Sequence, residues 1–199
     1  NVVGRSYAFW KGQFPQLRQL FPTQLADVSV DEFYAAVNQV RPSLIRVDAD
    51  EVTYSLHVIL RFELERRLFA GTVSVADLPE AWNAMMKEIL GVTPDSDANG
   101  VLQDVHWSMR AFGYFPSYAL GNLYGLQFWD ALKSDIPEVE SFIERKDYMP
   151  ILQWLRNHVH VHGCRYEPGD LILKVTGKPL SADSFISYLE HKYGQLYKL

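Results

Sequence analysis

Residues 48–70 constrain the fold more than any other segment, and they read "DADEVTYSLHVILRFELERRLFA". At about 100° per residue, the apolar side chains of this segment cover most of the circumference of a helix. A helix that is apolar nearly all round is a buried helix. The sequence therefore predicts a buried helix from about Asp48 to Ala70, ended by Gly71.

One narrow face of this predicted helix is polar. Its members follow one another at spacings of four, three, four and four residues: Asp50, Tyr54, His57, Arg61 and Glu65. Burying such groups without partners costs about 2–7 kcal/mol each. The polar stripe is therefore either a satisfied core network, pairing Asp with Arg and Tyr with His, or the wall of an active-site channel. The sequence leaves both interpretations open.

The rest of the chain is also helical in pattern, which predicts an all-α fold. Ser29 and Glu32 form a capping box, and Asp77, Pro79 and Gly91 bound another helix. Helices are expected over 29–40, 77–91, 115–135, 136–146, 149–163 and 181–197. The exception is at most a short β segment near 42–47, because the residue before Pro42 is biased towards extended backbone and the run is branched.

The loop "GVTPDSDANG", residues 91–100, separates two helical halves. It is short, so we expect one helical region with subregions of about 1–91 and 100–199 rather than two free domains. The chain also starts on Asn1 within an apolar and aromatic stretch, "NVVGRSYAFWKG". Ordinary termini are polar, so this start suggests a piece of a longer protein.

Composition excludes several classes of function. The formal net charge is -5 and no basic run is present, which argues against nucleic-acid binding. One cysteine cannot form an internal disulfide, so a reducing, cytoplasmic setting is expected. No apolar stretch reaches the ~18 residues needed to span a bilayer, so no membrane partner is expected.

The segment "HVHVHGC", residues 158–164, places three histidines at alternate positions before the single cysteine. On a strand they would share one face, as zinc ligands can. The preceding apolar residues keep helical spacing, however, which favours a helix that continues to Gly163. On that helix His158 and His162 share a face and His160 points away, and histidines suit the negative end of the helix dipole. The helical interpretation is favoured over a metal site.

A second polar cluster spans residues 103–118. It contains Gln103, Asp104, His106, Trp107, Tyr114 and Tyr118. Asp104 and His106 could form a carboxylate–imidazole pair for acid–base work. Tyr114 and Tyr118 lie four residues apart, so one helix turn could aim both hydroxyls at a developing oxyanion. Aromatic residues at this spacing also suit a protein core.

Two of these segments resemble motifs of the carboxypeptidase Taq family of zinc metallocarboxypeptidases. "IRVDAD" (45–50) matches its Ile-Arg-x-x-Ala-Asp motif, and "GVLQDVHW" (100–107) matches its Gly-x-x-Gln-Asp-x-His-Trp motif. "FGYFPSYALGN" (112–122) and the end of the chain, from "HVHGCRYEPGD" (160–170) onward, are also similar to the family. The resemblance covers essentially the whole chain.

The resemblance implies a helical lobe of a two-lobed fold with a deep groove, related to neurolysin and thimet oligopeptidase. It also implies a cytoplasmic, homodimeric exopeptidase that releases C-terminal residues from peptides with broad specificity. The zinc of the family is bound by His-Glu-x-x-His and His-Glu-Ser/Gly-Gln motifs, and this sequence contains no His-Glu pair. Residues 1–199 are thus expected to be the C-terminal region of such an enzyme, without metal ligands and inactive alone.

Residue roles follow from the resemblance. Tyr118 is expected to be the oxyanion donor, with Tyr114 second. Arg46 would bind the C-terminal carboxylate of the substrate or a structural partner, and Asp50 would brace it. The residues expected to line the groove beside the zinc are Gln103, Asp104 and His106. Two other functions stay open: a non-catalytic helical interaction module, and an independent metalloenzyme that uses the histidines near 160.

Overall fold

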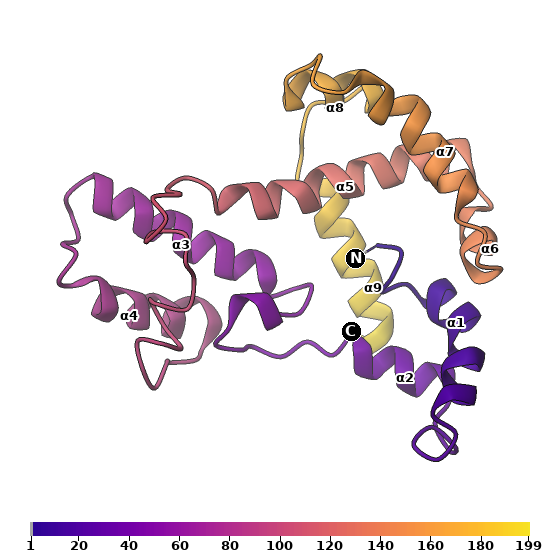
Figure 1. Cartoon of the computed structure of the whole chain (residues 1–199), viewed down its shortest axis with the longest axis horizontal. Helices are drawn as coiled ribbons and strands as arrows, with labels where there is room; N and C mark the ends of the chain where they lie inside the picture. Colours follow the sequence, from indigo (N-terminus) through magenta and orange to yellow (C-terminus); the bar gives the residue numbers. More distant parts are fainter. Residues whose placement is uncertain (1) are drawn as a thin grey trace. The chain divides into compact units, whose positions relative to one another are not determined.

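The computed structural model describes residues 2–199, and its regular structure is helical (Figure 1). The prediction of an all-α fold is confirmed. In chain order the elements are α1 Tyr7–Leu20, α2 Val30–Val37, the 3₁₀ turn η1 Arg46–Asp48, α3 Tyr54–Phe69, α4 Leu78–Leu90, α5 Pro116–Asp135, α6 Val139–Glu144, α7 Met149–His158, the 3₁₀ turn η2 His160–His162, α8 Pro168–Thr176 and α9 Asp183–Tyr197. Among residues 2–199, no helix combines the length and apolar character needed to cross a membrane.

Contacts divide the chain into two compact units. The first unit comprises residues 1–38 and 122–199, and the second comprises residues 39–121. The boundaries differ from the expected subregions of about 1–91 and 100–199, because the loop 91–100 lies inside the second unit. Helix α5 belongs to both units, since its first residues, 116–121, pack with the second unit.

The second unit is built on α3 and α4. Leu60 and Leu64 of α3 are fully buried, and they pack with Trp82 and Met86 of α4. Each pair is four residues apart in its helix, so both pairs lie on the faces that meet. Burial of each such side chain stabilises the fold by about 1.5–3 kcal/mol. This core fixes the polar side chains that α3 carries beside its apolar ones.

Helix α3 begins at Tyr54, six residues later than the sequence predicts. The reason is Asp50, whose Oδ1 accepts hydrogen bonds from the backbone N–H groups of Val52 and Thr53, both at 2.9 Å. Its Oδ2 accepts from Thr53 Oγ1 at 2.8 Å and from the N–H of Arg41 at 2.9 Å. The carboxylate thus supports a turn before the helix, as side chains that compete for backbone donors do.

No β-strand forms near 42–47 in the described chain. Ile45 is extended, with φ −101° and ψ 120°, but residues 46–48 then turn into η1. The expected short β segment is therefore limited to extended backbone at this point. Because residues 46–48 form a 3₁₀ turn, Arg46 projects from a tight turn rather than from a strand.

The first unit packs its helices around apolar side chains of α5, α6, α7 and α9. These core residues are Leu126, Trp129, Leu132, Val139, Ile143, Trp154 and Phe185. Helices α1 and α6 approach closely at Gly12, where a Cβ atom would overlap the backbone carbonyl oxygen of Glu144. Glycine is required here by contact between two backbones rather than by its own conformation.

Candidate functional site

The predicted site residues of 46–50 and 103–118 all lie in the second unit, where an ion cluster joins Arg46 to Asp104. Asp104 accepts hydrogen bonds from two arginines, with Arg46 mainly on Oδ1 and Arg61 on Oδ2. Arg46 Nη2 lies 2.6 Å from Oδ1, with Arg46 Nε at 3.2 Å from the same oxygen. Arg61 Nε lies 2.6 Å from Oδ2. Arg46 comes from η1 and Arg61 from α3, so Asp104 ties both elements to the segment after residue 100.

Burial and neighbouring charges have opposite effects on the pKa of Asp104 in this cluster. Burial alone would raise the pKa of the Asp104 carboxyl, but hydrogen bonds and charge from Arg46 and Arg61 outweigh it and leave the pKa lowered. Burial lowers the pKa of Arg61 to about 10, which still leaves the guanidinium charged at neutral pH. The cluster therefore carries one negative and two positive charges with almost no exposure to solvent.

Gln103 fixes the turn that carries Arg46. Its Nε2 donates to the carbonyl oxygens of Leu44 and Asn99, both at 3.0 Å, and of Gly100 at 3.1 Å. Its Oε1 accepts from the backbone N–H of Arg46 at 2.9 Å. An amide that supplies both donors and acceptors can satisfy backbone groups on two segments at once.

His106 and Tyr118 form the second part of the site. His106 Nε2 lies 2.9 Å from the hydroxyl of Tyr118. The imidazole packs against the buried Phe115 ring, with centroids 4.3 Å apart. The Arg46 guanidinium lies over the Tyr118 ring at 4.8 Å. Tyr118 therefore connects the imidazole to the ion cluster.

Two details differ from the sequence expectations. His106 Nδ1 lies 3.8 Å from Asp104 Oδ1, which is within ion-pair distance but too far for a hydrogen bond, so Asp104 does not orient the imidazole by a hydrogen bond as expected. Tyr114 precedes α5 and is 52% exposed, so it does not share a helix turn with Tyr118. The two tyrosine rings meet edge to face at 5.4 Å.

The polar stripe of α3 is a core network, but with different pairings from those expected. Tyr54 accepts from Arg46 Nη1 at 3.0 Å, and Arg61 binds Asp104. Glu65 accepts from Trp107 Nε1 at 2.7 Å and from the backbone N–H of Gly113 at 3.0 Å. Asp50 binds backbone and Thr53 groups rather than an arginine of the stripe. The partners of the stripe come mainly from other segments.

His57 is the exception in this network. It is fully buried, and neither ring nitrogen has a hydrogen-bond partner among the described residues. Burial, followed by the charges of Arg61 and Arg46, lowers its pKa from 6.5 to about 4. The imidazole is therefore neutral at physiological pH.

The structure also involves residues that the sequence did not assign to the site. Phe115 packs against His106, and its ring lies within 5.7 Å of the Arg46 guanidinium and 5.5 Å of the Arg61 guanidinium. Trp107, for which the sequence alone predicts no role, donates its indole N–H to Glu65. Their shared signal in the sequence is the high density of aromatic residues between positions 107 and 118.

The histidines of 158–162 occupy a helix end. Helix α7 stops at His158, one turn earlier than expected, and η2 follows until Gly163, whose φ is +53°. His158 Nδ1 lies 2.9 Å from the carbonyl oxygen of Trp154, and its ring stacks on the Trp154 ring at 4.5 Å. Within residues 2–199, no three His, Cys, Asp or Glu side chains are grouped so as to hold a metal ion.

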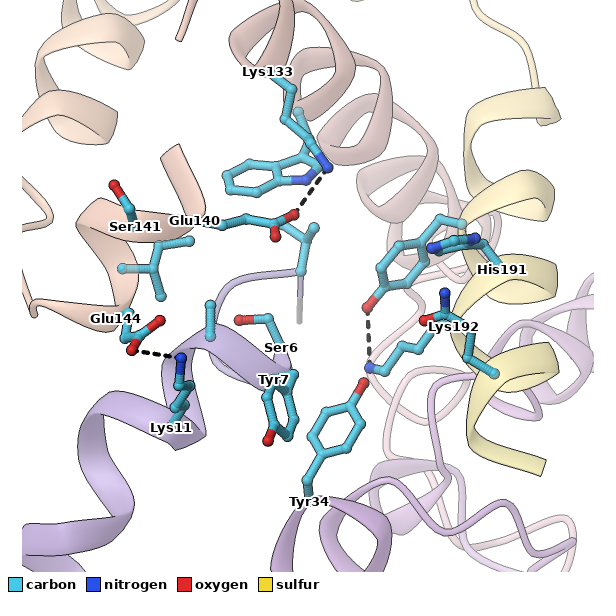
Figure 2. Close-up of a pocket in the computed structure, with 16 residues that line it drawn as sticks. Ser6, Tyr7, Lys11, Tyr34, Lys133, Glu140, Ser141, Glu144, His191 and Lys192 are labelled. Carbon is cyan, nitrogen blue, oxygen red and sulfur yellow. Dashed lines mark hydrogen bonds and ion pairs between the residues drawn. The ribbon is translucent and has the colours of Figure 1, made fainter. Parts of the chain in front are cut away.

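The first unit contains a hollow of about 390 Å³ that none of the predicted site residues line (Figure 2). Two ion pairs border it, Lys11 with Glu144 at 2.8 Å and Lys133 with Glu140 at 3.0 Å. The buried Lys192 donates to the hydroxyl of Tyr188 at 3.1 Å. The lysines that line the hollow are thus hydrogen-bonded or ion-paired within it.

Comparisons with known proteins agree on one family. The sequence model described as carboxypeptidase Taq (M32) metallopeptidase matches residues 1–193. Carboxypeptidase 1 of Bacillus subtilis is 46% identical over 199 residues, and thermostable carboxypeptidase 1 of Thermus thermophilus is 49% identical over 197 residues. These matches cover 100% and 99% of this chain but 40% and 38% of the relatives.

Solved structures give the same result. The crystal structure of the M32 carboxypeptidase from Deinococcus radiodurans R1 is 48% identical, with a TM-score of 0.95 over 100% of this chain and 40% of that chain. The Pyrococcus furiosus carboxypeptidase, described as Apo-Mg, is 37% identical with a TM-score of 0.93, over 97% of this chain and 39% of that chain. This chain therefore spans about two fifths of the length of the proteins it matches.

Proposed function

The chain belongs to the carboxypeptidase Taq (M32) metallopeptidase family, and we propose that it is the C-terminal region of a metal-dependent carboxypeptidase. The reaction is hydrolysis of the C-terminal peptide bond of peptides, with broad specificity. The relatives that match the whole chain are carboxypeptidases by name, which supports this assignment. The role of residues 1–199 is to supply polar side chains that bind and orient the reacting groups.

The observation that carries the proposal is the hydrogen bond between His106 and Tyr118. When water adds to a peptide carbonyl, the carbonyl oxygen becomes an oxyanion, and a positioned phenol can donate a hydrogen bond to it. When His106 Nε2 carries the ring proton and donates it to the Tyr118 oxygen at 2.9 Å, the contact orients the hydroxyl and leaves the phenol proton for the oxyanion. Tyr118 is supported over Tyr114 because the Tyr114 side chain is half exposed and precedes the helix.

Arg46 supports this pair rather than binding substrate directly. The guanidinium uses Nε and Nη2 on Asp104 and Nη1 on Tyr54, and the residue is 5% exposed. Of the two roles expected for Arg46, the structural one is favoured, because a bidentate substrate carboxylate needs donors that are free. Gln103 and Asp104 then act by holding Arg46, and Asp50 acts by holding the start of α3.

We propose that the metal of the enzyme is bound by residues outside this chain. Residues 2–199 offer no group of side chains that fits a metal ion, so no step is assigned to a metal here. We propose that the metal is zinc, bound by residues that precede Asn1 in the full-length protein, and that residues 1–199 alone are inactive. The full-length enzyme is further proposed to be a cytoplasmic homodimer.

The proposal is tested with the full-length protein and N-blocked peptides. We expect release of the C-terminal amino acid from peptides with a free terminus, none from the same peptides amidated at the C-terminus, and loss of release after chelation. The isolated 199-residue chain should release nothing. If the full-length protein bound peptides without hydrolysing them, a non-catalytic helical module would replace the proposed enzyme. Release by the isolated chain would instead favour an independent metalloenzyme.

A further inference from the structure

We infer that Glu65 is a positioning residue for the His106–Tyr118 pair, acting through a loop that it holds at both ends. This inference rests on the proposed function. The loop comprises residues 107–113, and we call it the Trp107 loop. Among the described residues, no hydrogen bond joins Glu65 to His106 or Tyr118. The effect of Glu65 on the position of this pair is therefore indirect.

Glu65 uses its two carboxylate oxygens on two different donors. Oε1 accepts from the indole Nε1 of Trp107 at 2.7 Å, and Oε2 accepts from the backbone N–H of Gly113 at 3.0 Å. The donors are the first and last residues of the Trp107 loop. Glu65 is 4% exposed, so both hydrogen bonds are shielded from competing water.

The middle of this loop is exposed and is held mainly by hydrogen bonds to residues 105–107. Met109 is 69% exposed, and Arg110 has φ +61°, a backbone conformation that costs a non-glycine residue free energy. The N–H groups of Ala111 and Met109 donate to the carbonyl oxygens of His106 and Val105, at 2.8 and 3.0 Å. The Phe112 ring meets the exposed Phe69 ring of α3 edge to face at 5.3 Å. The ends are therefore where the loop is attached to the buried face of α3.

The attachment points adjoin the proposed reactive pair. Trp107 directly follows His106, and its ring also meets the buried Trp82 edge to face at 6.0 Å. Gly113 lies two residues before Phe115, which packs on His106, and five before Tyr118. Releasing either end would allow His106 and Tyr118 to move apart, and a displacement of about 1 Å can reduce turnover by about 10²-fold.

A carboxylate is needed because two donors face one side chain. The amide of glutamine has the same shape but one acceptor oxygen, and its NH₂ group would point at a donor. Glu65→Gln should therefore release one end of the Trp107 loop with little change in volume. Glu63→Gln is the matched control, because Glu63 lies two residues earlier on α3 and forms an exposed pair with Arg66 at 3.1 Å.

The experiment measures steady-state kinetics of the full-length protein. For Glu65→Gln we expect kcat to fall at least ~10-fold with KM changed less than ~2-fold, because the displaced groups act in the transition state. Glu63→Gln should leave both constants within ~2-fold of the wild type. Amide hydrogen exchange should accelerate in the Trp107 loop of Glu65→Gln but not of Glu63→Gln.

A second variant tests the route of the effect. Trp107→Phe removes one of the two donors, so the single amide oxygen left by Glu65→Gln can serve Gly113. Glu65→Gln should then lower kcat less than ~3-fold in the Trp107→Phe background. If Glu65→Gln lowered kcat equally in the wild-type and Trp107→Phe backgrounds, the inference that Glu65 holds both ends of the Trp107 loop would be contradicted.

The outcomes separate this inference from the proposed function. If the wild-type protein releases no C-terminal residue, the proposed function fails and the positioning role fails with it. If the wild type is active and Glu65→Gln matches Glu63→Gln in kcat, the inference alone is overturned. It is also overturned if Glu65→Gln accelerates exchange throughout residues 39–121, because Glu65 would then support the fold rather than the loop.

Discussion

The Oδ2 atom of Asp104 lies 2.6 Å from Nε of Arg61, whose side chain has no exposure to solvent. Replacing Asp104 by Asn removes the negative charge and leaves two buried guanidinium groups without a counterion. Removing one partner of a buried ion pair costs about 3–5 kcal/mol. We expect Asp104→Asn to lower the free energy of unfolding of the full-length protein by this amount, as measured by urea unfolding.

Asp97→Asn is the control for that measurement, because Asp97 is exposed in the loop just before Asp104. Surface substitutions of this kind usually change stability by less than about 0.5 kcal/mol. Equal stability of the two variants would show that the Asp104 cluster contributes little.

His57 predicts a pH dependence of stability between pH 6.5 and about 4. Its pKa is lowered in the folded state, so below pH 6.5 the unfolded chain binds a proton that the folded chain does not. Stability should therefore fall as the pH is lowered through this range, by about 3 kcal/mol in total. Asp104, whose pKa is lowered from 3.8, contributes a loss only below that range.

The measurement is urea unfolding at several pH values between 4 and 7, on the wild type and on His57→Leu. Both ring nitrogens of His57 are buried without hydrogen-bond partners in the described chain, so leucine removes the titration without breaking a pair. The variant should lose stability less steeply with falling pH. Parallel curves for the two proteins would contradict the lowered pKa of His57.

The close approach of α1 and α6 at Gly12 predicts that a larger side chain at this position destabilises the fold. A Cβ at this position meets the backbone oxygen of Glu144, so Gly12→Ala should force α1 and α6 apart. Overpacking of this kind costs about 1–3 kcal/mol. Gly125→Ala, in α5 with open space around the added atom, should instead raise stability by up to about 1 kcal/mol. Thermal unfolding of both variants measures the contrast, and a loss in both would contradict the steric account.

Local signals predicted those parts of the fold in which the physical cause is local. The capping box is present, with Ser29 Oγ accepting from the N–H of Glu32 and the Glu32 carboxylate accepting from the N–H of Ser29. Gly91 ends α4 with φ +72°, as expected for a left-handed C-cap. Each depends on residues within four positions in the sequence, so the pattern contains the necessary information.

Two helices were not identified individually from the sequence. Helix α1 contains Gly12 and Pro15, and α8 begins with Pro168 and Gly169. In α1 both residues lie in the helix interior, where both types are unfavourable and tertiary packing overrides that preference. In α8 Pro168 stands in the first turn, which suits proline, so Gly169 is the residue that weakens the local helix signal. The packing of α1 on α6 connects residues more than 100 positions apart, which a local pattern does not show.

The candidate site was predicted as a set of residues but not as a set of pairings. The spacing of the polar stripe predicts that Tyr54, Arg61 and Glu65 share a face, and one of its two interpretations pairs the residues of the stripe with one another. Apart from the hydrogen bond of Arg61 to the His57 carbonyl oxygen, the partners of Arg61 and Glu65 lie 42 to 48 positions away, at Asp104, Trp107 and Gly113. Helical periodicity specifies a face, whereas the identity of the opposing segment depends on the tertiary fold.

Replacing the Tyr118 hydroxyl tests the central claim most directly. In the full-length protein, Tyr118→Phe keeps the ring that lies against Arg46 but removes the hydroxyl that binds His106 Nε2. We expect kcat for release of the C-terminal amino acid to fall by about 10²-fold with KM little changed, and Tyr114→Phe to lose much less. An unchanged kcat in Tyr118→Phe, or a larger loss in Tyr114→Phe, would contradict the assignment of the oxyanion donor.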